Sequence, residues 1–153
     1  MNSTDGTMTL HPDFREFAAS LNEHDVRYLV AGGYAVAYHG HPRYTKDIDF
    51  WIEREPENVR RLLDALSAFG FGSVGLEEED FLEPDQIVQL GYPPNRIDLL
   101  TDLEGVDFPS AHAERVTEDI DGVPVHFIGL DDLKRNKRAV GRHQDLADLE
   151  NLE

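Results

Sequence analysis

The chain has 153 residues, of which 40% are hydrophobic, so it is long enough to bury the core of one compact domain. Its 31 acidic and 14 basic residues give a formal net charge of −17 at pH 7, which opposes nucleic-acid binding unless positive charge is concentrated in one place. The absence of cysteine excludes disulfides and thiolate metal sites, so any bound metal would be held by oxygen ligands.

Residues 1–9 are polar and contain no apolar signal region, so we expect a flexible N-terminus followed by a single domain over residues 10–150. No window of the chain approaches the ~18 consecutive apolar residues of a membrane helix. We therefore expect a cytoplasmic protein that makes no contact with a membrane.

An amphipathic helix and a buried strand come first in the domain. Pro12 marks the start of the helix, whose apolar residues recur at helical spacing: Phe14, Phe17, Ala18 and Leu21. Residues 27–31 form a short apolar run that is typical of a buried strand. We expect the helix to pack on the sheet that this strand joins.

Gly32-Gly33 follow the strand, where the chain turns into a second helix over residues 34–39. The free N–H groups and the positive dipole end of a helix that begins after a glycine turn suit a phosphate. Three further residues, placed just ahead of the next strand, would hold triphosphate oxygens: Arg43, Thr45 and Lys46.

Asp47 and Asp49 begin the strand over residues 47–52, and the side-chain period of two puts both carboxylates on one face. The opposite face is apolar: Ile48, Phe50 and Ile52. A polar outer face on an edge strand is the alternative, but Trp51 continues the carboxylate face and argues against it. Two carboxylates held together either raise each other's pKa or bind a cation, so the pair predicts a divalent metal site.

Histidine gives no support to a zinc site, because the chain has no cysteine and no His-x-x-x-His spacing near the aspartates. His39 and His41 lie between the glycine turn and the carboxylate strand. We expect His39 to be a hydrogen-bonded scaffold residue.

Pro56 opens a third helix, which Gly70 ends. Residues 71–76 and 86–90 read as strands on either side of an acidic stretch, residues 77–80, which we expect to be a solvated turn and not a calcium loop.

Asp98 lies in a further strand expected over residues 96–100. One interpretation is that Asp98 is a solvated strand residue beside Arg96. A helix over residues 107–114 and a hairpin of residues 116–120 and 123–128 come next, with a two-residue turn at Asp121-Gly122.

The helical C-terminus carries a group of basic residues: Lys134, Arg135, Lys137, Arg138 and Arg142. They favour a local basic funnel for a nucleotide, or else a solvated helix face that pairs with Asp131 and Asp132. Lys137 follows Leu133 by four residues, so it lies on the buried stripe of its helix and needs a partner, such as a triphosphate or the two strand aspartates. The acidity of the remaining surface is typical of a salt-adapted, halophilic proteome.

Gly32-Gly33, a spacer, Asp47-x-Asp49 on a strand and the later Asp98 together resemble the nucleotidyltransferase superfamily, which has the DNA polymerase beta-like fold. Residues 32–49, 130–133 and 145–149 are similar to a small prokaryotic branch related to AbiEii-type toxins. The resemblance covers roughly residues 25–150. It implies an α/β (α+β) fold with a mixed sheet flanked by helices and a helical C-terminus.

This resemblance also implies an activity, the metal-dependent transfer of a nucleoside monophosphate from an NTP to a hydroxyl acceptor with release of pyrophosphate. Mg²⁺ or Mn²⁺ would be held by Asp47, Asp49 and Asp98, and the triphosphate by Gly32, Gly33 and Lys137 together with Arg43, Thr45 and Lys46. The acceptor stays open among a tRNA, a small molecule and a protein. A homodimer or a cognate regulatory partner, as in toxin–antitoxin pairs, would complete the cleft for a large acceptor.

Gly33 departs from the superfamily pattern, because many members have a serine there whose hydroxyl helps to hold the triphosphate. The alternative function is therefore a catalytically inactive module that binds a nucleotide or a toxin–antitoxin partner. A hydrolase that uses the same metals on a phosphodiester is a third, weaker alternative.

Overall fold

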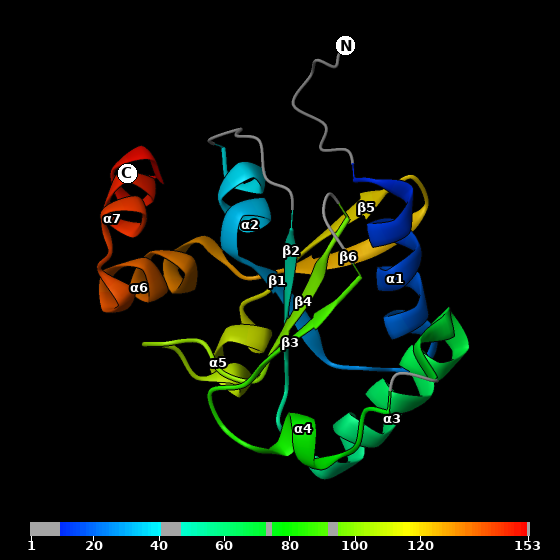
Figure 1. Ribbon diagram of the computed structural model, residues 1–153. Helices are drawn as coiled ribbons and strands as arrows, with labels where there is room; N and C mark the ends of the chain where they lie inside the picture. The colour runs from blue at the N-terminus through cyan, green and yellow to red at the C-terminus, as the bar shows by residue number, and fades with distance from the viewer. Residues whose placement is uncertain (1–9, 41–46, 73–74, 92–94, 153) are drawn as a thin grey trace.

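The computed structural model describes residues 10–40, 47–72, 75–91 and 95–152 (Figure 1). The described residues form a six-stranded sheet in the order β3-β4-β2-β1-β6-β5. The strands are β1 (Tyr28–Ala31), β2 (Ile48–Ile52), β3 (Ile87–Leu90), β4 (Ile97–Leu100), β5 (Val116–Ile120) and β6 (Val123–Phe127). The sheet is mixed, because β2 runs antiparallel to β1 but parallel to β4. The predicted α/β fold class with a mixed sheet is confirmed.

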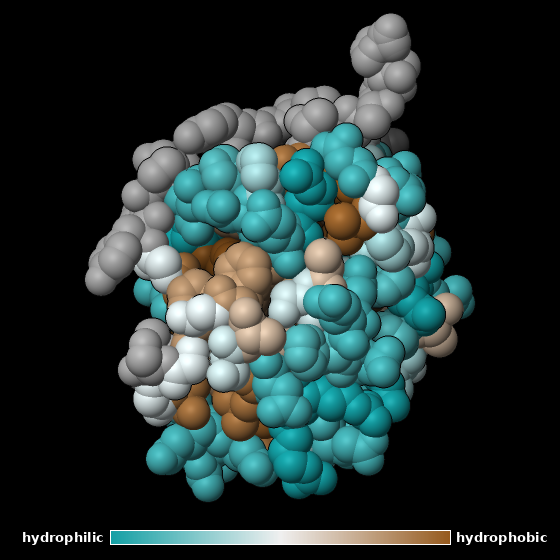
Figure 2. Space-filling view, turned by 90° about the vertical axis from the view of Figure 1, so that its right-hand side faces the viewer, coloured by the Kyte–Doolittle hydropathy of each residue, from teal (hydrophilic) through white to brown (hydrophobic). Residues whose placement is uncertain are grey.

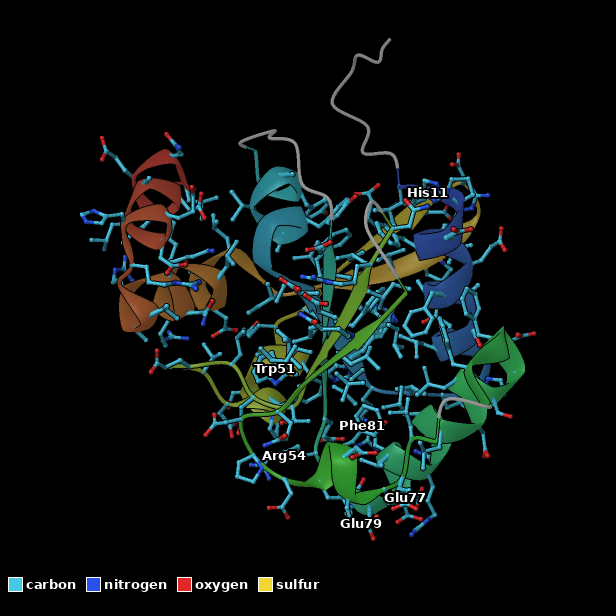
Figure 3. The ribbon with its side chains drawn as sticks, viewed as in Figure 1. His11, Trp51, Arg54, Glu77, Glu79 and Phe81 are labelled. Carbon is cyan, nitrogen blue, oxygen red and sulfur yellow. The ribbon has the colours of Figure 1, made fainter. Side chains whose placement is uncertain are left out.

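Strand β2 lies near the centre of the sheet and divides its side chains between two apolar cores. Ile48, Phe50 and Ile52 belong to the larger core, whereas Trp51 belongs to the smaller core on the other face. Trp51 is only 2% exposed and packs against Phe108 at a ring-centroid distance of 5.0 Å (Figure 3). The predicted burial on the Trp51 face is therefore correct, so the carboxylates that share this face do not lie on an open edge.

Helices cover both faces of the sheet (Figure 1). α1 (Pro12–Glu23) and α3 (Pro56–Leu66) lie over the larger core, where Phe17 of α1 meets Phe50 of β2 at 5.2 Å. Figure 2 shows this side of the molecule, whose surface is mostly hydrophilic around a smaller apolar area. α5 (Phe108–Ala113), α6 (Leu130–Val140) and α7 (His143–Leu152) lie on the other side, and α2 (Gly32–Tyr38) follows β1 directly. The predicted helical C-terminus is confirmed.

The strand expected over residues 71–76 is wrong for the described part of that range. The chain leaves α3 through a wide π-helical turn, η1 (Ser67–Phe71), in which Gly70 has a φ of 110°. Only glycine adopts such a φ at little cost, so the predicted stop at Gly70 becomes a kink inside a longer helical segment. The aromatic rings of this turn pack back on the core, where Phe17 meets Phe69 at 5.2 Å.

The acidic stretch at residues 77–80 is mostly exposed, as predicted, but it is more than a turn. A short helix, α4 (Glu79–Leu82), begins inside it, because Phe81 is fully buried and anchors this turn beneath α3. Glu77 and Glu79 point outward from the same segment (Figure 3).

The Asp121-Gly122 turn of the β5–β6 hairpin matches its prediction, with φ values of 52° and 87° that suit a two-residue turn.

None of the helices in the described part of the chain combines the length and the apolar character that crossing a membrane requires.

Candidate active site

Asp49 and Asp98 are register partners on the parallel strands β2 and β4. Both side chains therefore project from the same face of the sheet, and Asp47 lies one strand period before Asp49. Asp98 is 8% exposed, whereas Asp47 keeps about a third of its side chain exposed. The structure thus brings the three sequence-predicted carboxylates to one face at the centre of the sheet.

Negative charge accumulates where these carboxylates meet. The pKa of Asp49 is raised to about 7, first by burial, then by the charges of Asp98 and Asp47 and by a hydrogen bond with Asp98. Lys137 acts in the opposite direction and lowers the pKa of Asp49. Such crowding is favourable only if a proton or a cation offsets part of the charge.

Arg96 supplies a positive charge that the sequence interpretation had not assigned to the site. Its guanidinium Nη2 donates to Asp47 Oδ2 at 2.8 Å, and its Nε donates to Asp98 Oδ1 at 3.1 Å. Arg96 stands two residues before Asp98, so the strand period of two puts both side chains on the carboxylate face. The Arg-x-Asp spacing beside the Asp-x-Asp spacing is the sequence signal that could have revealed this contact.

Asp47, Asp49 and Asp98 offer only carboxylate oxygens, which are the donors that Mg²⁺ and Mn²⁺ prefer. As the side chains lie, no group of three acidic or histidine residues in the described ranges surrounds a common ion position. The guanidinium of Arg96 lies against Asp47 and Asp98 instead. The donor chemistry and the crowded charge fit a divalent cation, which these three residues would hold once the arginine has moved.

Gly32 lets the β1–α2 turn approach the carboxylates closely. Its φ is +63°, and a Cβ at this position would lie 2.0 Å from Asp49 Oδ2. Helix α2 therefore begins at Gly32 itself, two residues before the predicted start at residue 34. Glycine is required here both by the backbone conformation and by the neighbouring carboxylate.

A cleft of about 420 Å³ opens in front of Asp49 and Asp98. Gly32 lines it from the β1–α2 turn, and the C-terminal helices line it with Lys137 and Arg142. The edge of the sheet and the segment after β4 contribute apolar and acidic side chains: Ile87, Leu100, Leu103, Asp85, Asp102 and Glu104. A cleft of this volume, with carboxylates at its base, suits a small charged molecule.

Lys137 is buried, with 5% exposure, and is held between two carboxylates of α7. Its Nζ lies 3.2 Å from Asp145 Oδ1 and 3.1 Å from Asp148 Oδ2. The inward orientation predicted from its spacing is correct, but the protein partners are on α7 and not on β2. Asp145 and Asp148 were not assigned to any site from the sequence, although their i, i+3 spacing places them on one side of a helix.

Other basic residues of the C-terminal group are also paired with carboxylates. Arg142 Nε donates to Asp145 Oδ2 at 2.7 Å, and Arg135 pairs with Asp132. Burial alone would raise the pKa of Asp145. The hydrogen bonds and charges of Arg142 and Lys137 outweigh burial, so the pKa of Asp145 is lowered. Arg135, Lys137 and Arg142 are therefore ion-paired within α6 or between α6 and α7. Pairing with Asp132 was one of the two interpretations of this basic group.

Gly33 is the second residue of α2, and the cleft lining includes Gly32 but not Gly33. The other predicted residues fall into two groups. His39 Nε2 lies 2.7 Å from the carbonyl oxygen of Ile128, so it ties the end of α2 to the segment after β6 as a hydrogen-bonded scaffold residue. Four others lie outside the described residues: His41, Arg43, Thr45 and Lys46.

Comparison with known proteins gives a consistent result. The model of a family described as "Nucleotidyltransferase of unknown function (DUF6036)" matches residues 10–153. A candidate nucleotidyltransferase from Thermotoga maritima superposes with a TM-score of 0.61 at 15% identity, over 90% of this chain and 88% of the other. An antigenic nucleotidyltransferase-like protein from Paracoccidioides brasiliensis superposes with a TM-score of 0.55 at 20% identity, over 90% and 72% of the two chains.

No curated protein sequence gives a significant match. At 15% and 20% identity, the two structural similarities establish a shared fold. The match of the family model over residues 10–153 confirms the superfamily resemblance seen in the sequence, whereas the AbiEii-type branch finds no support in these comparisons.

Proposed function

The chain belongs to the DUF6036 family of nucleotidyltransferases of unknown function, and on that premise we propose that it transfers a nucleoside monophosphate from an NTP to a hydroxyl acceptor. The acceptor oxygen forms a bond to the α-phosphorus, and the bond from that phosphorus to the bridging β-phosphate oxygen breaks, which releases pyrophosphate. The observation that carries this proposal is the register pairing of Asp49 with Asp98, both of which line the cleft, with Asp47 one strand period from Asp49.

We assign the three carboxylates separate roles. Asp47 and Asp49, on one face of β2, would hold Mg²⁺ or Mn²⁺, which would offset the triphosphate charge and polarise the α-phosphate. Asp98 would take the proton of the attacking hydroxyl or complete the ligand set. Its register position opposite Asp49 supports either role, because both carboxylates face the same bound molecule.

The triphosphate would lie along the turn between β1 and α2. Gly32 and Gly33 leave the backbone open to close approach there, since neither has a side chain. Lys137 and Arg142 line the far wall of the cleft beside Asp145, so each would give up part of its pairing with that carboxylate to hold a phosphate. On sequence grounds alone we include Arg43, Thr45 and Lys46 in the triphosphate site.

A small molecule or a protein fits the acceptor role better than a tRNA. The formal charge of −17 repels a polyanion, and Arg135, Lys137 and Arg142 are ion-paired within α6 and α7. A second copy of the chain or a cognate regulatory partner would extend the cleft for a larger acceptor.

Two measurements test the proposal. Calorimetric titration of each NTP with Mg²⁺ or Mn²⁺ should detect binding to the wild type that is lost in Asp47→Ala/Asp49→Ala. Label on the α-phosphate, but not on the γ-phosphate, should then appear in an acceptor. Both measurements should be made at high and at low salt, because salt screens the repulsion among the acidic surface charges.

A nucleotide-binding module without turnover is the second candidate, and Gly33 is the observation that favours it. A helix that begins with two glycines offers no hydroxyl to the triphosphate. Metal-dependent NTP binding without transfer to any acceptor would select this candidate. Absence of NTP binding in every salt condition would leave a scaffold that works through a protein partner.

A further inference from the structure

Four polar side chains form a small lattice on the carboxylate face of β2 and β4. Asp47 and Asp49 are one strand period apart, and so are Arg96 and Asp98. Asp49 pairs in register with Asp98, and the amide of Ile48 donates to the carbonyl of Arg96 at 3.2 Å, which sets Arg96 beside Asp47. The arginine is thus fixed by the sheet as a member of the site and does not reach it from a distant loop.

Arg96 uses its guanidinium as a two-pronged donor. Nη2 donates a hydrogen bond to Asp47 Oδ2 at 2.8 Å and also lies 3.4 Å from Asp98 Oδ2. Nε donates to Asp98 Oδ1 at 3.1 Å. The side chain is 28% exposed, so one side of it faces solvent. A planar guanidinium that bridges two carboxylates makes short, charge-assisted contacts that fix both acceptors in place.

A divalent ion that takes the same carboxylates as ligands has to approach their oxygens to about 2.1 Å. The guanidinium nitrogens already stand at hydrogen-bond distance from Asp47 Oδ2 and from both oxygens of Asp98. Two cations at the same oxygens repel each other strongly, so an ion that takes these oxygens as ligands displaces Arg96 from at least one carboxylate.

We propose that Arg96 is a displaceable counter-cation of the metal site, which holds Asp47 and Asp98 in position and competes with the divalent ion for their oxygens. The inference rests on the proposed function, since it concerns the same carboxylates. Arg96 is a positioning residue in this scheme, because it acts through Asp47 and Asp98 and does not touch the reacting groups. It lowers the affinity for the ion and delays loading of the site.

The test is titration of Mn²⁺ alone into the full chain after chelator treatment, followed by calorimetry and by the electron paramagnetic resonance signal of free Mn²⁺. Arg96→Gln should bind Mn²⁺ about tenfold more tightly than the wild type, as expected when a charge-assisted contact no longer competes. Arg96→Lys should fall between the two, because lysine keeps the charge but not the two-pronged geometry. Arg61→Gln is the matched control, since Arg61 pairs with Glu57 within α3 and should leave Mn²⁺ affinity unchanged.

Unchanged or weaker Mn²⁺ binding in Arg96→Gln would overturn the inference, because the arginine would then be only a scaffold for the carboxylates. If Arg96→Gln does not fold by circular dichroism, Arg96→Lys decides alone, with tighter binding supporting competition and equal or weaker binding refuting it. Wild-type binding that depends on Asp47 and Asp49 but is not tightened in either variant would refute this inference and leave the proposed function intact. Absence of Mn²⁺ binding in all variants would overturn this inference, and it would overturn the proposed function as well only if NTP with Mn²⁺ also fails to bind the wild type.

Discussion

Asp49 of β2 and Asp98 of β4 face each other as register partners on parallel strands, with the buried Ile48 and Ile97 as the neighbouring pair. The apolar side chains on the opposite face lock the register, since a slip of either strand by one residue would turn its carboxylate into the larger core. The site is therefore built on the rigid centre of the sheet, and conservative substitutions can test it without moving the backbone.

Asp98→Asn should abolish most of the transferase activity while the protein keeps its fold. The amide cannot accept the proton of an attacking hydroxyl and is a weaker ligand, so we expect turnover to fall roughly 10²- to 10⁴-fold. Steady-state transfer of α-phosphate label measures this. Asp85→Asn is the control, because Asp85 lines the same cleft but is exposed and lies off the carboxylate lattice. Full activity in Asp98→Asn would remove Asp98 from the catalytic set.

Asp49→Asn should stabilise the protein in the presence of a chelator, although it should abolish activity. Asp49 lies in a crowd of negative charge with Asp47 and Asp98, and an amide of the same size removes the repulsion and can donate to Asp98. We expect a gain on the order of 1–2 kcal/mol in the free energy of unfolding by urea denaturation. Adding Mn²⁺ should stabilise the wild type but not the variant. A loss of stability with chelator would contradict the crowding argument.

The strand that carries Asp47 and Asp49 could be predicted because polar and apolar side chains alternate over residues 47–50 and an apolar run, Trp51-Ile52, continues it. The structure after α3 could not be predicted in the same way, because glycines separate Phe71 from Leu76 and the apolar residues there show neither a helical nor a strand period. The turn there is set by the packing of Phe69 and Phe71 on the core, on either side of the kink at Gly70. Such a contact between distant parts of the chain leaves no local pattern.

The ion-pair partners of the charged residues could not be predicted from the sequence either. The spacing of Lys137 from Leu133 shows that the lysine points inward, but only the angle between α6 and α7 selects Asp145 and Asp148 as its neighbours. Arg96 likewise reaches Asp47 only because β2 and β4 are adjacent and in register. Periodicity gives the face on which a residue lies, whereas the pairing of elements gives its contacts.

Gly32→Ala should damage both stability and activity. A side chain here would have to adopt a φ of +63° and would place its Cβ 2.0 Å from Asp49 Oδ2, so the carboxylate must move. Gly122→Ala is the matched control, because Gly122 has a φ of +87° but nothing within 4 Å of the added carbon. We expect a loss of about 1 kcal/mol in the control and more in Gly32→Ala, by thermal unfolding. Equal losses would show that the close approach to Asp49 has no energetic consequence.

His112 should make the protein less stable as the pH falls. Burial, followed by the charge of Arg115, lowers the pKa of His112 from 6.5 to about 4, and its ring stacks on Phe108. Between these two values the unfolded chain binds a proton that the native state does not, so the free energy of unfolding decreases as the pH is lowered through this window. His112→Gln should show a shallower decrease in chemical denaturation, with the exposed His143→Gln as control. Parallel pH profiles in the wild type and His112→Gln would rule out this contribution.

Lys137→Met should destabilise the protein by about 3 kcal/mol, because it leaves Asp145 and Asp148 buried without the cation that lies between them. Lys134→Met on the same helix, which has less burial, should change the free energy of unfolding by no more than about 0.5 kcal/mol. Adding Asp148→Asn to Lys137→Met should restore part of the loss, because one uncompensated charge is removed. Urea denaturation measures all four proteins. If Lys137→Met keeps wild-type stability and loses only NTP affinity, the lysine serves the nucleotide and not the junction of α6 with α7.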